Sequence, residues 1–143
     1  MITGLSHAHS GFRWIILVLL IATVVRAFLN RKNSDLGVQA KLGLFTMIAM
    51  HIQLLVGFGL YMSGQWKANA EESISNFINR EHLPMMVIAI ILGTLGHSLS
   101  KRSEDVSVKY KKKLTFFGIS LLIILLMIPW PFMRGFGEVY NWF

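Results

Sequence analysis

Histidine is the residue type in this sequence with the most chemistry to offer. Five histidines lie within or near long apolar stretches: His7, His9, His51, His82 and His97. An ionisable or metal-binding side chain at membrane depth costs free energy, so it indicates a function with a specific partner. Because histidine commonly holds haem iron, the pattern favours a bound haem. Taken singly, each histidine also fits a hydrogen bond between helices.

Composition excludes several classes of function. The chain of 143 residues is 54% hydrophobic and 15% charged, which is unlike a soluble domain. It has no cysteine, which excludes disulfides, iron–sulfur clusters and covalently attached haem, so any haem would be held non-covalently by His or Met ligands. No basic stripe interleaved with aromatic residues is present, so no nucleic-acid partner is expected. The sequence also lacks a nucleophile constellation, a phosphate loop and a carboxylate dyad.

Four apolar segments are each near the length of about 20 residues that a helix needs to cross a bilayer. They are predicted at 9–29, 40–62, 82–100 and 114–132. The segments are apolar all round and lack the alternation of barrel strands, so they are expected to be helices. We therefore predict an all-α fold, an integral membrane four-helix bundle formed by a single domain, residues 1–143.

Basic residues set the predicted orientation in the membrane. Ten of the 14 Lys and Arg residues lie in two connections, 26–41 and 101–113. The positive-inside rule places both connections in the cytoplasm. Both termini and the loop 63–81 are then extracytoplasmic, and the expected location is a bacterial inner membrane.

Local signals predict three further features. Apolar residues at helical spacing in the outer loop predict a short helix over 71–80 that lies on the membrane surface. Pro129 and Pro131 are expected to end the fourth helix. In the third span, Ala89, Gly93 and Gly96 form a stripe of small residues. Such a stripe lets helices approach closely, and it could equally make room for a flat macrocycle.

Two of the histidine positions have matching depths. At 1.5 Å per residue, His9 lies ~25 Å from the inner boundary, and His7 and His82 lie ~28 Å from it. The two axial ligands of one haem approach opposite faces of the ring, so they share a depth when the ring stands along the membrane normal. We therefore predict His9 and His82 as axial ligands, with His7 as a substitute. The alternative is that these are ordinary interfacial residues.

The other two histidines match less well in depth. His51 lies at ~15 Å, near the midplane, and His97 at ~6 Å. A second haem would require this pair to close a gap of about 9 Å. Each could instead serve a quinone or proton site, and each also fits an interhelical hydrogen bond.

Arg13 strengthens the hypothesis of an outer site. It lies ~20 Å from the inner boundary, within the apolar zone. A buried arginine needs an anion, and its planar guanidinium suits a carboxylate. The predicted partner is a haem propionate, and the competing partner is Glu81, which would need no cofactor.

Four short strings resemble a family of small four-helix bacterial membrane proteins, common in Bacteroidetes and described as cytochrome b-like. They are His7-Ala-His9-Ser-Gly-Phe-Arg13-Trp14, Met50-His51-Ile-Gln53-Leu-Leu-Val-Gly57, Glu81-His82 followed by Met85-Met86, and Gly96-His97-Ser98 followed by Lys101. The resemblance covers nearly the whole chain, and it implies haem b and electron transfer. The second span has one histidine where better-known b-type cytochromes have a widely spaced pair. This difference argues against two haems that carry electrons across the membrane.

The leading hypothesis is a haem-b-binding integral membrane protein that passes electrons between quinone and a respiratory partner. A rival hypothesis is a non-catalytic accessory subunit of a larger respiratory or transport complex, whose histidines only join helices. A third is a haem-handling enzyme or chaperone with an open coordination site. The expected partners are the lipid bilayer, respiratory membrane subunits or further copies of this chain, and quinone.

Overall fold

Four long helices make up most of the computed structural model, which describes residues 2–32, 37–64 and 72–130. They are α1 (Ile2–Leu29), α2 (Gly37–Met62), α4 (Leu83–Lys101) and α5 (Val106–Met127). A short helix, α3 (Glu72–Phe77), and one π-helical turn, η2 (Ile78–His82), precede α4. No strand occurs in the described ranges, so the predicted all-α class is confirmed for them.

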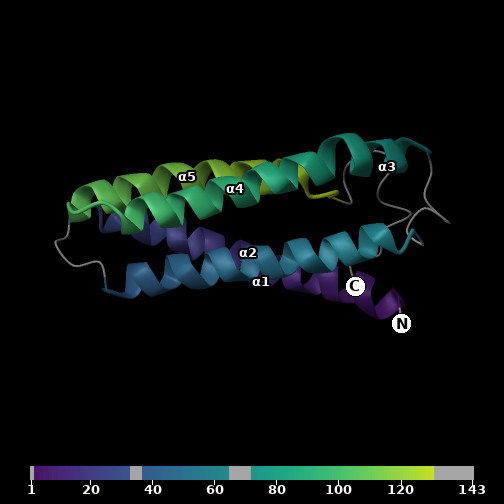
Figure 1. Ribbon diagram of the computed structural model, residues 1–143, viewed down its shortest axis with the longest axis horizontal. Coiled ribbons are helices and arrows are strands. Elements are labelled where there is room, and N and C mark those ends of the chain that lie inside the picture. Colours follow the sequence, from purple (N-terminus) through teal and green to yellow (C-terminus); the bar gives the residue numbers. More distant parts are fainter. Residues whose placement is uncertain (1, 33–36, 65–71, 131–143) are drawn as a thin grey trace.

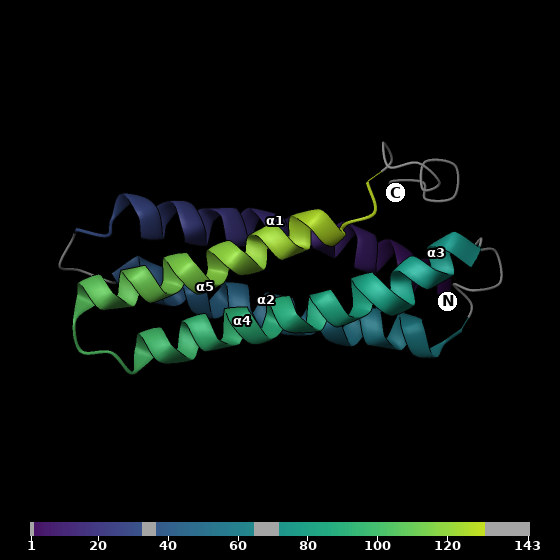
Figure 2. The same cartoon turned by 90° about the horizontal axis from the view of Figure 1, so that it is seen from above.

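The four long helices run side by side, with α1 and α2 in one layer and α4 and α5 in the other (Figure 1). α1 contacts α2 and α5, and α4 contacts the same two helices. The connection from α1 to α2 and the connection from α4 to α5 join helices at the same end of the molecule (Figure 2). The N-terminus and α3 lie at the other end. The two basic regions therefore share one end, as predicted, while their cytoplasmic location stays a prediction.

Among the described residues, three helical segments are long and apolar enough to cross a membrane. They are Gly4–Leu29, Gly37–Met62 and Ile74–Lys101. Their outward faces carry large apolar side chains such as Val18 and Leu55, which are 66% and 71% exposed. Surfaces of this kind suit lipid rather than water.

The fourth long helix, α5, differs at both ends from the span predicted over 114–132. α5 begins at Val106, inside the predicted 101–113 connection, because the Asp105 carboxylate accepts a hydrogen bond from the Ser107 N–H at 2.7 Å and caps the helix. It ends at Met127 because Pro129 holds Ile128 in an extended conformation, with φ −70° and ψ 126°. The helix end predicted from Pro129 is thus confirmed. Its apolar part, from Leu114 to Met127, is about 20 Å long.

A proline also shapes the start of the third span. Pro84 lies in the first turn of α4, lacks an N–H and crowds the carbonyl four residues before it. The turn before it widens, so that the Leu83 N–H donates to the Ile78 carbonyl five residues back. α3, η2 and α4 are therefore continuous. The helix predicted over 71–80 is confirmed from Glu72 to Phe77, although it continues through η2 into α4 instead of ending near residue 80. Its position on the membrane surface stays a prediction.

The core lies between the two layers and is built largely from aliphatic residues. The small residues of α4 serve this packing. A Cβ on Gly93 would lie 3.0 Å from the Met50 Cε atom, and one on Gly96 would lie 2.7 Å from the Phe116 Cβ atom. Close helix packing, the first of the two predicted uses of the stripe, therefore accounts for both glycines.

Candidate functional site

His9 and His82 meet at the end of the molecule that carries α3. Their ring centroids are 6.5 Å apart, and the ring planes are inclined by 69°. His9 comes from α1, and His82 is the last residue of η2. Two imidazoles bound to opposite sides of one metal, with metal–nitrogen bonds of about 2 Å, have centroids roughly 6–6.5 Å apart. The separation therefore equals that of two ligands sharing one ion.

A backbone carbonyl fixes the tautomer of His82. Its Nδ1 atom lies 2.8 Å from the Met127 carbonyl oxygen. Because a carbonyl can only accept, Nδ1 carries the proton and Nε2 keeps its lone pair. Metal-ligating histidines commonly donate their second ring N–H to a carbonyl in this way.

The Met127 carbonyl is available because α5 ends there. The last carbonyls of a helix have no partner within it. The residue four positions later is Pro131, which has no N–H to donate. The prolines that end α5 thus also leave an acceptor for His82, and the ring of Phe77 lies 6.2 Å from that of His82.

α2 positions His9. The Gln53 side-chain amide donates to the His9 backbone carbonyl at 2.8 Å. One turn further along, Gly57 lets the imidazole lie directly against the helix, since a Cβ there would be only 2.8 Å from the His9 Cε1 atom. The His9 Nδ1 atom is buried and has no hydrogen-bond partner in the described parts of the chain. A buried nitrogen left in this state is costly.

Sequence reasoning assigned no role to Gln53 or Met127, and it interpreted Gly57 only as a small residue that allows close helix packing or makes room for a macrocycle. The available signal was the spacing of Gln53 and Gly57, because residues four apart lie on one face of a helix. No comparable signal marks Met127, whose contribution is a backbone atom.

His7 does not share the site. It is exposed, and it is separated from His9 by about 200° of rotation around α1. Because His9 faces His82, His7 points away from it. The arrangement gives no support to the prediction of His7 as a substitute ligand.

Arg13 lies on the same face of α1 as His9, one turn further into the apolar zone. It is half-buried, and its guanidinium is close enough to both site histidines for its charge to act on them. The Arg13 Cζ atom is 5.3 Å from the centroid of the Trp14 ring. Glu81, the alternative partner, is exposed.

His51 and His97 face different surroundings. The His51 Nδ1 atom donates to the Met47 carbonyl at 2.8 Å, and the ring lines a groove between α2 and α4. His97 lies close enough to Lys113 and Lys101 for their positive charges to act on it. Its Nδ1 atom is buried without a hydrogen bond among the described residues. Nothing in this arrangement supports their pairing in a second haem site.

A second polar cluster, which the sequence analysis missed, lies at the basic end. Lys113 was interpreted only as a topology signal, yet it is 2% exposed and its Nζ atom donates to the Gln39 carbonyl at 2.7 Å. Gly43 makes room for it, because a Cβ there would lie 2.8 Å from Nζ. Nearby, the Thr23 and Thr46 hydroxyls are hydrogen-bonded at 2.8 Å. Desolvation by burial and the neighbouring charge of Lys109 lower the pKa of Lys113 to about 8.

Comparison of the chain with protein-family models, with curated proteins and with solved structures finds no match. The candidate site therefore has to be interpreted from its own geometry. It consists of two half-buried imidazoles whose centroid separation suits two ligands of one metal, a cation beside them and a helix face shaped to receive one of the rings.

Proposed function

We propose that this chain is a haem-b-binding membrane protein of electron transfer, in which His9 and His82 would hold the haem iron. The observation that carries the proposal is the 6.5 Å separation of the two ring centroids. A porphyrin supplies four nitrogen ligands to its iron, so two histidines complete the set. The described residues contain no group of three or more potential ligands, so a metal held by side chains alone would lack ligands there.

The residues present fit this group. His82 is held by the Met127 carbonyl in the tautomer that leaves Nε2 with a lone pair. His9 is half-buried, with an Nδ1 atom that has no partner in the described part of the chain, and Gly57 provides the cradle against which the ring lies. When bound, haem would supply reversible one-electron chemistry. The protein would orient the ligands, limit access of water and place the Arg13 charge beside the group, where it would hold a propionate.

The accessory-subunit hypothesis is the second candidate, and one observation favours it. The hydrogen bond from His82 to the Met127 carbonyl joins η2 to the end of α5 without any cofactor. On this hypothesis His82 would stabilise helix packing, and the protein would be colourless.

A spectrum decides between the two candidates. The wild-type protein and the variants His9→Ala, His82→Ala and His7→Ala would be purified from a haem-replete host, and oxidised and dithionite-reduced spectra recorded. We expect wild type and His7→Ala to show the sharp reduced bands of a six-coordinate low-spin haem, because His7 is exposed and turned away. The other two variants should lose or broaden these bands. Folded but colourless wild-type protein would overturn the haem proposal.

A further inference from the structure

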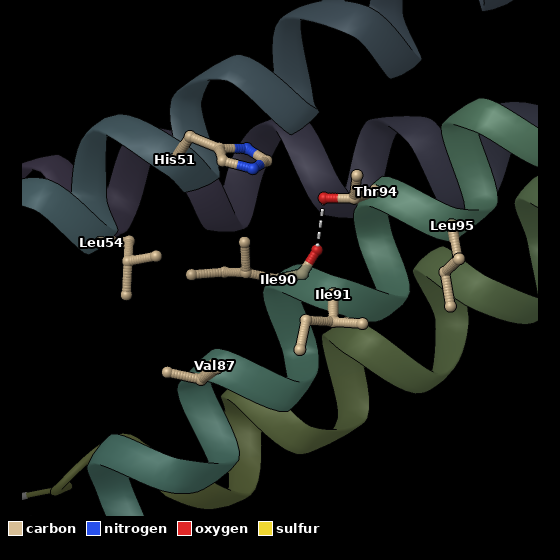
Figure 3. A pocket seen from close by; sticks show the side chains of 7 residues that line it. All are labelled: His51, Leu54, Val87, Ile90, Ile91, Thr94 and Leu95. Atoms are coloured by element: carbon tan, nitrogen blue, oxygen red, sulfur yellow. Dashed lines mark hydrogen bonds between the residues drawn. The ribbon is translucent and has the colours of Figure 1, made fainter.

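An open groove of about 300 Å³ lies between α2 and α4. His51 extends from α2 into this space toward Thr94 and Ile90, and the remaining wall is aliphatic (Figure 3). The α4 side chains that edge the groove are partly exposed, Ile91 by 52%, so the groove faces the surroundings of the helices. Its volume is at the lower end of the range for small-molecule sites.

Both polar side chains of the groove have already used their protons. The Thr94 hydroxyl donates to the Ile90 carbonyl at 2.8 Å, which leaves its oxygen as an acceptor only. The His51 Nδ1–H is likewise used by the Met47 carbonyl, which leaves the Nε2 lone pair as an acceptor. At ~15 Å from the inner boundary, water is scarce, and an unpaired acceptor is costly there. The groove therefore presents two hydrogen-bond acceptors, at His51 and Thr94, within an apolar wall, and a polar ligand that fits it must donate.

We propose that this groove binds the head group of a lipid-soluble quinol, whose hydroxyl donates to the His51 Nε2 atom. A quinol combines a flat apolar ring, a hydroxyl donor and a tail that dissolves in the bilayer. A lipid acyl chain fits the apolar wall but offers no donor, so it would leave Nε2 unsatisfied.

The position of the groove suits a reductant for the outer site. This part of the inference rests on the proposed function. His51 precedes Gly57 on α2 by about 9 Å of helix axis, and Gly57 lies directly against His9. A quinol bound at His51 would therefore lie close to a haem held by His9 and His82, without sharing any ligand with it.

Photolabelling tests the proposal directly. Full-length protein in phospholipid nanodiscs would be labelled with an azido-quinone that has been reduced to its quinol, and the labelled peptides mapped by mass spectrometry. We expect label on the α2 and α4 segments around His51 and Ile91, displaced by an unlabelled quinol. His51→Leu should weaken this labelling by about tenfold, because the hydrogen bond is lost and apolar contact remains. Ile91→Trp should block it by filling the groove.

His97→Leu is the matched control, because it removes an imidazole on α4 that does not line the groove, so labelling should be unchanged. Unchanged labelling in His51→Leu, label elsewhere on the chain, or equal displacement by excess phospholipid would each overturn the proposal. The measurement does not need haem. Colourless protein that labels at the groove would remove the haem proposal alone, whereas haem-loaded protein without label would remove the quinol proposal alone.

Discussion

The two ends of the molecule bury polar side chains of different kinds. At the basic end, Lys113 reaches the Gln39 carbonyl across the space between α5 and α2, so the charged group has a protein partner. At the other end, His9 and His82 face one another, and the His9 Nδ1 atom has no partner among the described residues. Buried atoms without a partner occur at both ends, because the Gln39 Oε1 and Ser100 Oγ atoms at the basic end also lack one in the described part of the chain. The meeting of two imidazoles, and not the unpartnered atoms, therefore distinguishes the candidate site from the structural cluster.

The largest effect is expected from Gly57, which tests whether the histidine end is shaped around His9. In Gly57→Ala the new methyl group would lie 2.8 Å from the His9 Cε1 atom and displace the ring. We expect loss of the low-spin haem spectrum. Gly59→Ala is the control on the same helix, because its Cβ would be 3.8 Å from Leu5, an ordinary contact. Equal spectra in the two variants would contradict the role given to Gly57.

Truncation of Lys113 tests whether the basic end is structural. Lys113→Ala removes a buried stem and leaves a cavity, so we expect a loss of about 2 kcal/mol in the free energy of unfolding. The haem spectrum of the folded fraction should not change. Lys111→Ala is the control: Lys111 lies on the same turn of α5 but is exposed, so its truncation should cost little free energy of unfolding. Thermal unfolding in detergent measures both variants, and a haem spectrum altered by Lys113→Ala would mean that the two ends are coupled.

Removal of the Arg13 charge tests how the histidine end is tuned. Arg13→Leu should keep the helices and the ligands but lower the reduction potential by roughly 60 mV, because a positive charge near the iron favours the reduced state. Potentiometric titration of the haem bands gives the shift. Arg31→Leu, at an exposed position in the turn after α1, should leave the potential unchanged. A potential that is the same in Arg13→Leu and wild type would remove the propionate role.

The smallest effect is a pH dependence confined to the basic end. The pKa of Lys113 is lowered from 10.5 to about 8 in the fold, so the unfolded chain binds the proton more tightly. The free energy of unfolding should therefore rise as the pH increases through this window. Melting temperatures across this range should show the rise in wild type and in Lys111→Met. Lys113→Met should lack it, and a curve parallel to wild type would place the titration elsewhere.

Much of the fold could be predicted because it depends on composition and on distance along the chain. Long apolar runs predict helices, and the position of Pro129 predicts where α5 ends. The proximity of His9 and His82 followed from the same kind of information. Helical rise fixes the depth of each residue relative to the basic ends, and the two depths agreed.

What the sequence by itself determined, then, is position along the helix axes. Rotation about those axes and the identity of neighbours came only from the tertiary structure. Packing decided that His9 and not His7 faces His82, and that Lys113 points inward to Gln39. The partners of the site histidines are a glycine surface and a backbone carbonyl, which carry no side-chain signature in the sequence. The physical reason is that rise per residue is a local property of the backbone, whereas facing and contact depend on how all four long helices pack together.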